Sequence, residues 1–211
     1  GCSNPSDVEI AISLGLDVVK FFPAEAAGGL AMIKAMSAPY VNMKFMPTGG
    51  ISAKNLNEYL GFNKIIACGG SWMVKSELIN AGEFDKIEVL TREAVQLMLG
   101  FELAHVGINE TDEEAAGKTA GRFESIFGFA KKTGASSVFA GTAVEVMKAP
   151  GLGAKGHIGI RTNFIDRAVN YLEYQGVEFD QSSAKYDDKG KLKAIYLKEE
   201  VGGFAVHLVQ K

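Results

Sequence analysis

One lysine stands in the middle of an apolar stretch that has the pattern of a β-strand. Lys20 lies in the run Val18-Val19-Lys20-Phe21-Phe22, where alternation points Val18, Lys20 and Phe22 to one face. A parallel strand is usually buried on both faces, and burial lowers the pKa of an ammonium group. A neutral amine is a nucleophile that forms a Schiff base with a carbonyl compound. We therefore expect Lys20 to be buried and catalytic; the alternative is a lysine that reaches solvent or pairs with a nearby carboxylate.

Paired glycines follow two later segments that also have strand patterns. The segment 43–47 ends in Thr48-Gly49-Gly50, and the segment 64–68 ends in Gly69-Gly70-Ser71. Glycines let the backbone approach a ligand closely, and successive backbone N–H groups can then bind a phosphate. Together with Lys20, the two loops suggest a carbonyl substrate that carries a phosphate.

The three histidines of the chain occupy equivalent positions of an internal repeat. His105 and His157 open the two copies, His207 ends the second copy, and Glu145 holds the corresponding position at the end of the first. Three imidazoles and one carboxylate suit a divalent transition metal ion such as Zn²⁺, Ni²⁺, Mn²⁺ or Fe²⁺. The alternative for each histidine is a half-buried strand residue that is hydrogen-bonded to its neighbours.

Helices and strands alternate through the first hundred residues. Helical patterns cover about 5–15, 30–36, 55–60 and 84–99, and the strands that bear Lys20 and the two glycine loops lie between them. Strands about twenty-five residues apart, separated by helices, indicate βαβ units and a parallel sheet. We expect Lys20 and both loops to lie at the carboxyl ends of these strands, where the active sites of α/β barrels are found.

The repeat begins at about residue 101 and has a period of about fifty residues. Each copy has a strand, then an amphipathic helix at 113–127 or 165–175, then hairpin-like strands that end at 143–147 or 205–209. This pattern predicts two βαββ modules side by side. We therefore expect two domains, 1–100 and 101–211.

The composition is that of an ordinary globular protein. Of the 211 residues 47% are hydrophobic and 22% charged, and the net charge of −3 argues against binding to nucleic acid or to an anionic membrane. Two cysteines provide neither a disulfide framework nor a cysteine-type zinc cluster. With no apolar run of membrane-spanning length and no signal peptide at its start, the chain is expected to be cytoplasmic.

Three ordered motifs in the first half resemble a known family. VVKFFPAE around Lys20, PTGGIS at 47–52 and GGSW at 69–72 look like the C-terminal half of the class I 2-keto-3-deoxy-6-phosphogluconate/2-keto-4-hydroxyglutarate (KDPG/KHG) aldolases. The resemblance implies the last three βα units of a (β/α)₈ barrel and makes Lys20 the Schiff-base lysine for pyruvate. It also implies that the following residues contact substrate or phosphate: Phe22, Thr48, Gly49, Gly50, Gly70 and Ser71.

The chain departs from that family in one respect. The family's general-base glutamate, and an arginine and a threonine that bind substrate, lie on earlier strands that would precede Gly1. Glu25 is close to Lys20 in sequence, but it fits better as a helix-start or surface carboxylate. We therefore expect this chain alone to be inactive as an aldolase.

The second half is similar to the vicinal oxygen chelate superfamily, which includes glyoxalase I, fosfomycin-resistance proteins and extradiol dioxygenases. The similarity rests on the HxGI module starts and on VEVMK and VHLVQ at the module ends. It implies a metal site made by His105, Glu145, His157 and His207. Glutamate is commoner than histidine at the last of these positions, so Glu145 would be the sole carboxylate available as a base.

Taken together, the resemblances imply part of an aldolase that cleaves KDPG or KHG to pyruvate and an aldehyde, joined to a glyoxalase-like metal-binding domain. The aldolase half would need no cofactor. The alternative for the second half is a glyoxalase-like metalloenzyme in its own right, or a non-catalytic module for small-molecule binding or oligomerisation. We expect a keto acid or keto acid phosphate as the small-molecule partner, and a homo-oligomer.

Overall fold

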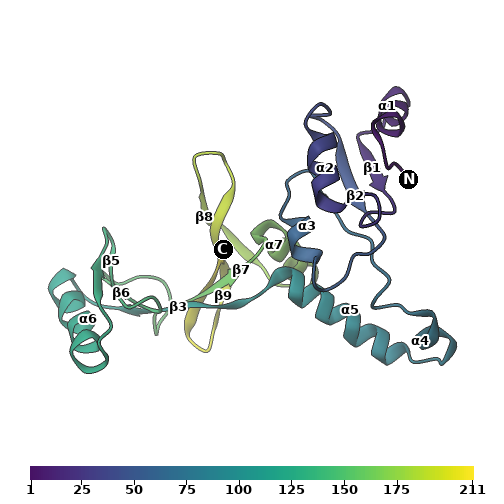
Figure 1. The fold of residues 1–211 in the computed structure, drawn as a ribbon. Coiled ribbons are helices and arrows are strands. Elements are labelled where there is room, and N and C mark those ends of the chain that lie inside the picture. The colour runs from purple at the N-terminus through teal and green to yellow at the C-terminus, as the bar shows by residue number, and fades with distance from the viewer. The chain divides into compact units, whose positions relative to one another are not determined.

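Residues 1–211 are all described by the computed structural model, in which the chain divides into two units, Gly1–Met98 and Leu99–Lys211 (Figure 1). None of the helices combines the length and the apolar character that a membrane span requires.

The first unit is built from short parallel strands and helices. Its elements are α1 (Pro5–Ser13), β1 (Val18–Phe21), α2 (Gly29–Ser37), β2 (Lys44–Pro47), α3 (Leu56–Leu60), α4 (Ser76–Asn80) and α5 (Phe84–Leu99). Pro5 begins α1, and the side chain of Asn4 caps it by accepting a 3.1 Å hydrogen bond from the Asp7 N–H. Strands β1 and β2 pair in parallel, as the βα pattern predicted, with Lys20 opposite Met46.

The third strand predicted in this unit, at 64–68, does not form a regular strand. The segment meets β2 only through isolated parallel bridges, Phe45 with Ile65 and Thr48 with Gly69. A further bridge joins Cys2 to Phe21 on the other side of β1. The two bridges are not adjacent, so the ladder of hydrogen bonds between this segment and β2 is interrupted. The unit therefore holds one regular strand pair with a less regular extended segment on each side.

Burial alternates along β1, and this overturns one expectation. Val19 and Phe21 are buried at 4% and 0% exposure, whereas Val18 and Lys20 are exposed. The apolar core of the unit lies on the Val19 side, where residues from the helices and β2 pack: Val8, Ile33, Met36, Phe45, Tyr59 and Leu60. Within this unit the opposite face of β1 is exposed, so Lys20 is solvated instead of buried.

The second unit contains one eight-stranded sheet and two helices. Its elements are β3 (Glu102–Asn109), α6 (Glu113–Phe127), β4 (Lys131–Thr133), β5 (Ser137–Ala140), β6 (Val144–Met147), β7 (His157–Thr162), α7 (Ile165–Tyr174), β8 (Phe179–Tyr186), β9 (Leu192–Val201) and β10 (Phe204–Gln210). The strand order is β4-β5-β6-β3-β7-β10-β9-β8. The predicted repeat is thus present, but each module is βαβββ: three strands follow each helix, where two were expected.

The extra strand of the first module had no sequence pattern to reveal it. Strand β4 consists of Lys131, Lys132 and Thr133, all exposed, and pairs only with the edge of β5. A strand that buries no side chain lacks the period-two alternation on which strand prediction depends. Exposed lysines on so short a strand also discourage further pairing at this edge of the sheet.

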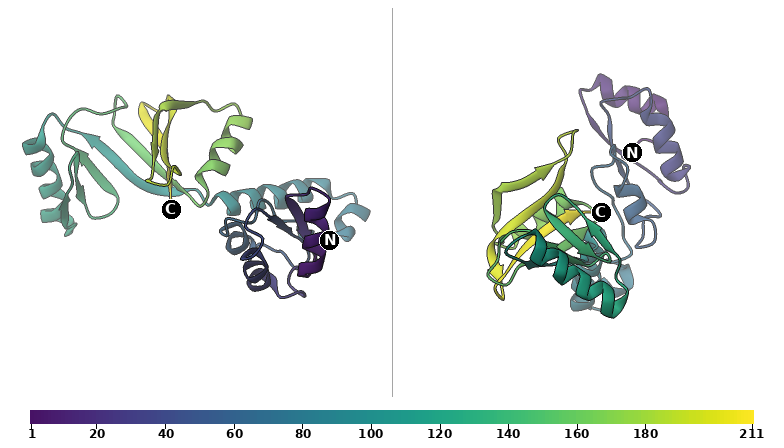
Figure 2. Two further views of the ribbon diagram at one scale, coloured as in Figure 1. Left: turned by 90° about the horizontal axis from the view of Figure 1, so that it is seen from above. Right: turned by 90° about the vertical axis from the view of Figure 1, so that its left-hand side faces the viewer.

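Each module packs one helix against one face of the sheet. In the first module, Ala116 and Ala120 of α6 contact Val138, Ala140 and Val146, and all five are buried. In the second, α7 packs on β9 and β10 (Figure 2). Because side chains alternate along a strand, the residues between these apolar positions point away from the helices. That opposite face carries the histidines.

Candidate metal centre and strand-borne lysine

The symmetry of the sheet gathers four side chains at its centre. Strands β3 and β7 pair antiparallel, β6 runs parallel beside β3, and β10 runs parallel beside β7. In this register Gly107 lies between Glu145 and His157 on its two neighbouring strands. Gly159 likewise lies between His105 and His207. Two equivalent rows therefore each place a glycine between two candidate ligands.

The two glycines make room for the imidazole rings. A Cβ atom built on Gly107 would lie 2.0 Å from the Cε1 atom of His157, and one on Gly159 would lie 2.5 Å from Cε1 of His105. Both distances are far below an ordinary carbon–carbon contact of about 3.5–4.0 Å. Neither glycine has a positive φ, so neither is needed for its backbone conformation. Glycine is needed at both positions because the imidazole ring of the residue opposite, His157 or His105, extends over the glycine on the neighbouring strand.

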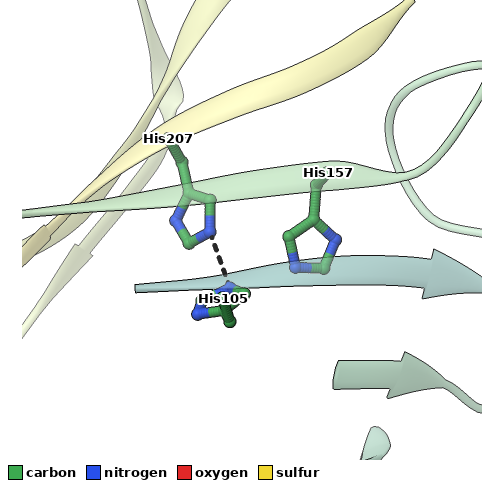
Figure 3. A group of neighbouring side chains, drawn as sticks. All are labelled: His105, His157 and His207. Atoms are coloured by element: carbon green, nitrogen blue, oxygen red, sulfur yellow. Dashed lines mark hydrogen bonds between the residues drawn. The ribbon is translucent and has the colours of Figure 1, made fainter. Parts of the chain in front are cut away.

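The ligand atoms converge at short distances (Figure 3). His105 Nε2 and His157 Nε2 each lie 3.2 Å from Glu145 Oε2, and His105 Nε2 lies 3.1 Å from His207 Nε2. The three histidine ligand atoms are all within 4.8 Å of one another. Ligands about 2.1 Å from a metal ion at tetrahedral or octahedral angles are themselves about 3.0–3.4 Å apart. The three short separations therefore match those expected around a single ion, whereas the 4.8 Å limit for the histidine set would require the side chains to draw closer on binding.

The protonation states also suit a metal ion. Burial, followed by the charge of His105, lowers the pKa of His207 to about 3, and burial lowers the pKa of His105. Burial alone would raise the pKa of Glu145, but hydrogen bonds from His157 and Ser137, with the nearby imidazoles, lower it to about 2. Neutral imidazoles and an ionised carboxylate are the forms that bind metal.

Ser137 and Tyr196, which no motif had indicated, complete the surroundings. The Ser137 hydroxyl donates a 2.7 Å hydrogen bond to Glu145 Oε1, which leaves Oε2 directed at His105 and His157. The ring of Tyr196 stacks on His207, with 4.6 Å between centroids and 21° between planes. Gly107 and Gly159 were also not selected, although the repeated His-x-Gly spacing was a signal that could have identified them.

One nitrogen of the cluster is without a partner. His207 Nδ1 is buried and makes no hydrogen bond. Metal-binding histidines usually donate their second N–H to an oxygen, which fixes the ring. His207 is held instead by stacking on Tyr196. Its other nitrogen, Nε2, lies 3.1 Å from His105 Nε2, and His157, buried at 4% exposure, is held 3.2 Å from Glu145.

In the first unit, the residues around Lys20 lie at the carboxyl ends of β1 and β2. The Lys20 Nζ atom is 4.8 Å from the ring centroid of Phe22, which is 47% exposed. Gly49 and Gly50 both have positive φ, and Thr48 is bridged to Gly69, so the two glycine loops are neighbours. Gly70 and Ser71 continue the second loop, with the ring of Trp72 packed against Gly70.

Backbone hydrogen bonds tie the first of these loops to the segment after Lys20. Ala24 N–H donates to Thr48 O at 2.8 Å, and Glu25 N–H donates to Gly49 O at 3.1 Å. The N–H groups of Gly49 and Gly50 take no part in these bonds. Glu25, which we expected to be a surface or helix-start carboxylate, is exposed; it covers Gly50 and accepts a hydrogen bond from the buried Tyr59 hydroxyl.

Comparison with known proteins finds sequence relatives of the first unit. Residues 1–90 match the family model described as "KDPG and KHG aldolase". The 2-dehydro-3-deoxy-phosphogluconate aldolase of Haemophilus influenzae is 48% identical over 98 residues, which are 46% of this chain and 46% of that protein. The KHG/KDPG aldolase of Escherichia coli K12 is 42% identical over 96 residues. The chain thus spans about half the length of the curated relatives that it matches.

Two kinds of solved structure each cover about half of this chain. KDPG aldolase from Legionella pneumophila, with pyruvate captured as a covalent carbinolamine, covers 44% of this chain and 46% of its own, at 39% identity and a TM-score of 0.43. A methylmalonyl-CoA epimerase covers 51% of this chain and 93% of its own, at 18% identity and a TM-score of 0.38. The resemblance predicted from the motifs around Lys20 is confirmed: over residues 1–90 this chain is related in sequence to the KDPG and KHG aldolases.

Proposed function

We propose that the second unit binds one divalent transition metal ion through His105, Glu145, His157 and His207. The observation that carries the proposal is the 3.1–3.2 Å spacing of the ligand atoms. Two imidazole nitrogens lie against Glu145 Oε2, and the third imidazole lies against His105, so the four side chains form one compact cluster of metal-ligating groups. The two glycines that admit the rings support the same interpretation.

A bound ion would supply Lewis-acid polarisation of an oxygen atom on a small substrate. Glu145 is the only carboxylate among the four residues, so any proton taken from the substrate beside the ion would fall to it. Its depressed pKa keeps it ionised across the physiological range. By its resemblance to the vicinal oxygen chelate proteins, the unit would act as a glyoxalase-like metalloenzyme; a non-catalytic binding module is the alternative.

Metal titration tests this proposal directly. The purified chain should bind one equivalent of Co²⁺ or Zn²⁺, and His105→Ala, His157→Ala and Glu145→Gln should each weaken binding at least about tenfold. Glu102→Gln is the matched control, because Glu102 is on the same sheet and does not contact the cluster. Substoichiometric metal that is unchanged in His105→Ala and His157→Ala would rule the site out.

We propose as a second function that the first unit is the Schiff-base-bearing part of a class I aldolase that cleaves KDPG or KHG. The match of residues 1–90 to that family supports it. The Lys20 amine would attack the keto carbon of the substrate, water would leave, and a C=N bond would form. The loops of Thr48–Gly50 and Gly69–Ser71 would bind the phosphate or substrate oxygens, since their glycines leave backbone N–H groups open to an anion.

Borohydride trapping tests the role of Lys20. Labelled pyruvate should be reduced onto Lys20 of this chain and not onto Lys20→Met, while Lys34→Met, a change to another lysine of the same unit, should leave labelling intact. Because Lys20 is exposed and the earlier-strand residues of the family are not among these 211, we expect slow labelling and no measurable aldol cleavage. Label found equally on other lysines would refute a specific Schiff base.

A further inference from the structure

One carboxylate lies directly against the first of the two glycine loops. A Cβ atom built on Gly50 would lie 2.4 Å from Cγ and 2.6 Å from Cβ of Glu25, so the stem of this side chain covers the loop. The backbone N–H of Glu25 also donates to Gly49 O at 3.1 Å. A negative charge beside the loop opposes the binding of a phosphate there, unless the carboxylate group is directed elsewhere.

The loop offers N–H groups to an anion because its carbonyl groups are already bonded. Thr48 O accepts a backbone N–H at 2.8 Å, and Gly50 O accepts Asn55 Nδ2 at 3.1 Å. With Gly49 O bonded to Glu25, every carbonyl oxygen of the loop is satisfied. The N–H groups of Gly49 and Gly50 form no hydrogen bond in the structure. Such N–H groups bind a carboxylate as well as a phosphate, so the two compete for them.

Tyr59 directs the carboxylate away from those N–H groups. Its ring is buried at 1% exposure, and its hydroxyl donates a hydrogen bond to Glu25 Oε1. The three heavy atoms nearest to a Cβ atom built on Gly50 are Cγ, Cβ and Cα of Glu25, so the carboxylate oxygens are turned away from that glycine. They lie instead at Gly29, where an added Cβ would be 3.2 Å from the Tyr59 hydroxyl and 3.3 Å from Glu25 Oε1.

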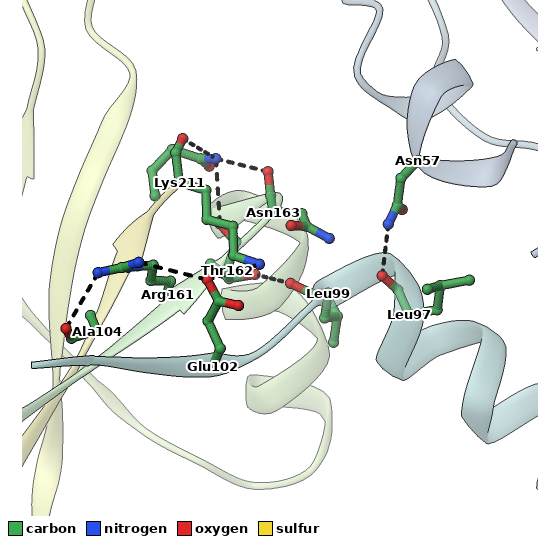
Figure 4. A network of polar contacts seen from close by, with 10 residues as sticks. Asn57, Leu97, Leu99, Glu102, Ala104, Arg161, Thr162, Asn163 and Lys211 are labelled. Atoms are coloured by element: carbon green, nitrogen blue, oxygen red, sulfur yellow. Dashed lines mark hydrogen bonds and ion pairs between the residues drawn. The ribbon is translucent and has the colours of Figure 1, made fainter. Parts of the chain in front are cut away.

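The helix that carries Tyr59 is anchored on a second helix. Tyr59 lies in α3, and Asn57 of the same helix donates a 2.8 Å hydrogen bond from Nδ2 to Leu97 O of α5 (Figure 4). The hydroxyl is therefore held at a fixed point. Glu25 is exposed, so its carboxylate can turn about the Cβ–Cγ bond once the hydrogen bond to Tyr59 is removed.

We propose that Tyr59 is a positioning residue that keeps the Glu25 carboxylate off the N–H groups of Gly49 and Gly50, and so keeps the loop open to a phosphate. The inference rests on the phosphate-binding role proposed above for this loop. Without the Tyr59 hydroxyl, Glu25 is an internal competitor that bonds to the N–H groups and repels an incoming phosphate. A hydroxyl that only stiffened the loop would act regardless of the charge of Glu25.

Titration with inorganic phosphate, followed through the ¹H and ¹⁵N shifts of the Gly49 and Gly50 amide groups, tests this inference. Tyr59→Phe should weaken phosphate binding about three- to tenfold. Adding Glu25→Gln to Tyr59→Phe should restore binding to within twofold of the natural chain. Adding Glu58→Gln, which removes an exposed carboxylate of α3, is the matched control and should restore nothing. Unchanged binding in Tyr59→Phe, or equally weak binding with and without Glu25→Gln, overturns the inference.

The same amide groups report on Glu25 when no phosphate is present. In Tyr59→Phe the amide protons of Gly49 and Gly50 should move downfield, because a hydrogen bond to a carboxylate deshields them, and Glu25→Gln should cancel this shift. Absence of the shift refutes the restraint by Tyr59. Absence of any phosphate-dependent shift in the natural chain refutes the phosphate-binding role of the loop instead.

If Tyr59→Phe does not fold, two variants of the exposed Glu25 replace it. The carboxylate of Glu25→Asp is one methylene short of the Tyr59 hydroxyl, and Glu25→Asn has the same shape without the charge. The charged variant should bind phosphate at least about threefold more weakly than the neutral one. Equal binding by the two overturns the inference.

Discussion

Replacing Gly107 with alanine should remove one metal ligand through a single added methyl group. The new Cβ would lie 2.0 Å, 2.2 Å and 2.4 Å from the Cε1, Nδ1 and Nε2 atoms of His157. Ordinary contacts begin at about 3.5 Å, so the ring must move by about 1.5 Å. Metal–ligand bonds tolerate about 0.2 Å. His157 is thereby lost as a ligand, and we expect Co²⁺ affinity to fall at least about 100-fold.

The same substitution should also destabilise the second unit. The His157 ring packs against both His105 and His207, at centroid distances of 5.1 Å and 5.4 Å, and these contacts restrict where it can turn. Overpacking of this kind costs about 1–3 kcal/mol. For a unit of this size each kcal/mol lowers the melting temperature by about 4–8 °C. Thermal unfolding of the metal-free chain, followed by circular dichroism, measures this part of the effect.

Gly117→Ala is the matched control for Gly107→Ala. Gly117 lies inside α6, and a Cβ added there meets nothing within 4 Å. Alanine is favoured over glycine in a helix by about 1 kcal/mol, so this variant should melt at the same or a higher temperature and bind Co²⁺ normally. If Gly107→Ala bound Co²⁺ within threefold of the natural chain and melted like Gly117→Ala, the packing argument for the site would be refuted.

Two further predictions concern single hydroxyl groups. Ser137→Ala removes the donor to Glu145 Oε1, so Co²⁺ affinity should fall about tenfold. Ser137→Thr keeps a hydroxyl and should retain most of the affinity. Equal titrations for the two variants would contradict the role of the hydroxyl. Burial, then the hydrogen bond to Glu25, raises the pKa of Tyr59 above its usual value near 10. Below pH 10 the Tyr59 hydroxyl is protonated in both the folded and the unfolded chain, so its contribution to the free energy of unfolding is complete. Above pH 10 the hydroxyl of the unfolded chain loses its proton first, and the free energy of unfolding falls. Urea unfolding between pH 8 and 11 should show that fall in the first unit of the natural chain and a smaller one in Tyr59→Phe; identical slopes would refute it.

Local signals in the sequence determined most helices of this protein, although the short α4 (Ser76–Asn80) was not predicted. Asp112 accepts a hydrogen bond from the Ala115 N–H at the start of α6, and Gly128 ends the helix in the left-handed conformation, so 113–127 could be predicted to the residue. The repeat of His-x-Gly determined that two modules exist and that His105 and His157 are equivalent. The ordered motifs around Lys20 determined the relationship to the aldolases, because that information lies in residue identity and spacing.

Only the tertiary structure decided which faces are buried and which side chains meet. Lys20 is solvated because its face of β1 is exposed within the first unit, and the residue pattern of a strand does not show what packs on it. Strand β4 was invisible because it buries nothing. Ser137 joins Glu145 only through the pairing of β5 with β6, and Tyr196 reaches His207 only through that of β9 with β10. The sequence named the four candidate ligands, but their distances of 3.1–3.2 Å depend on a strand register set by packing across the whole sheet.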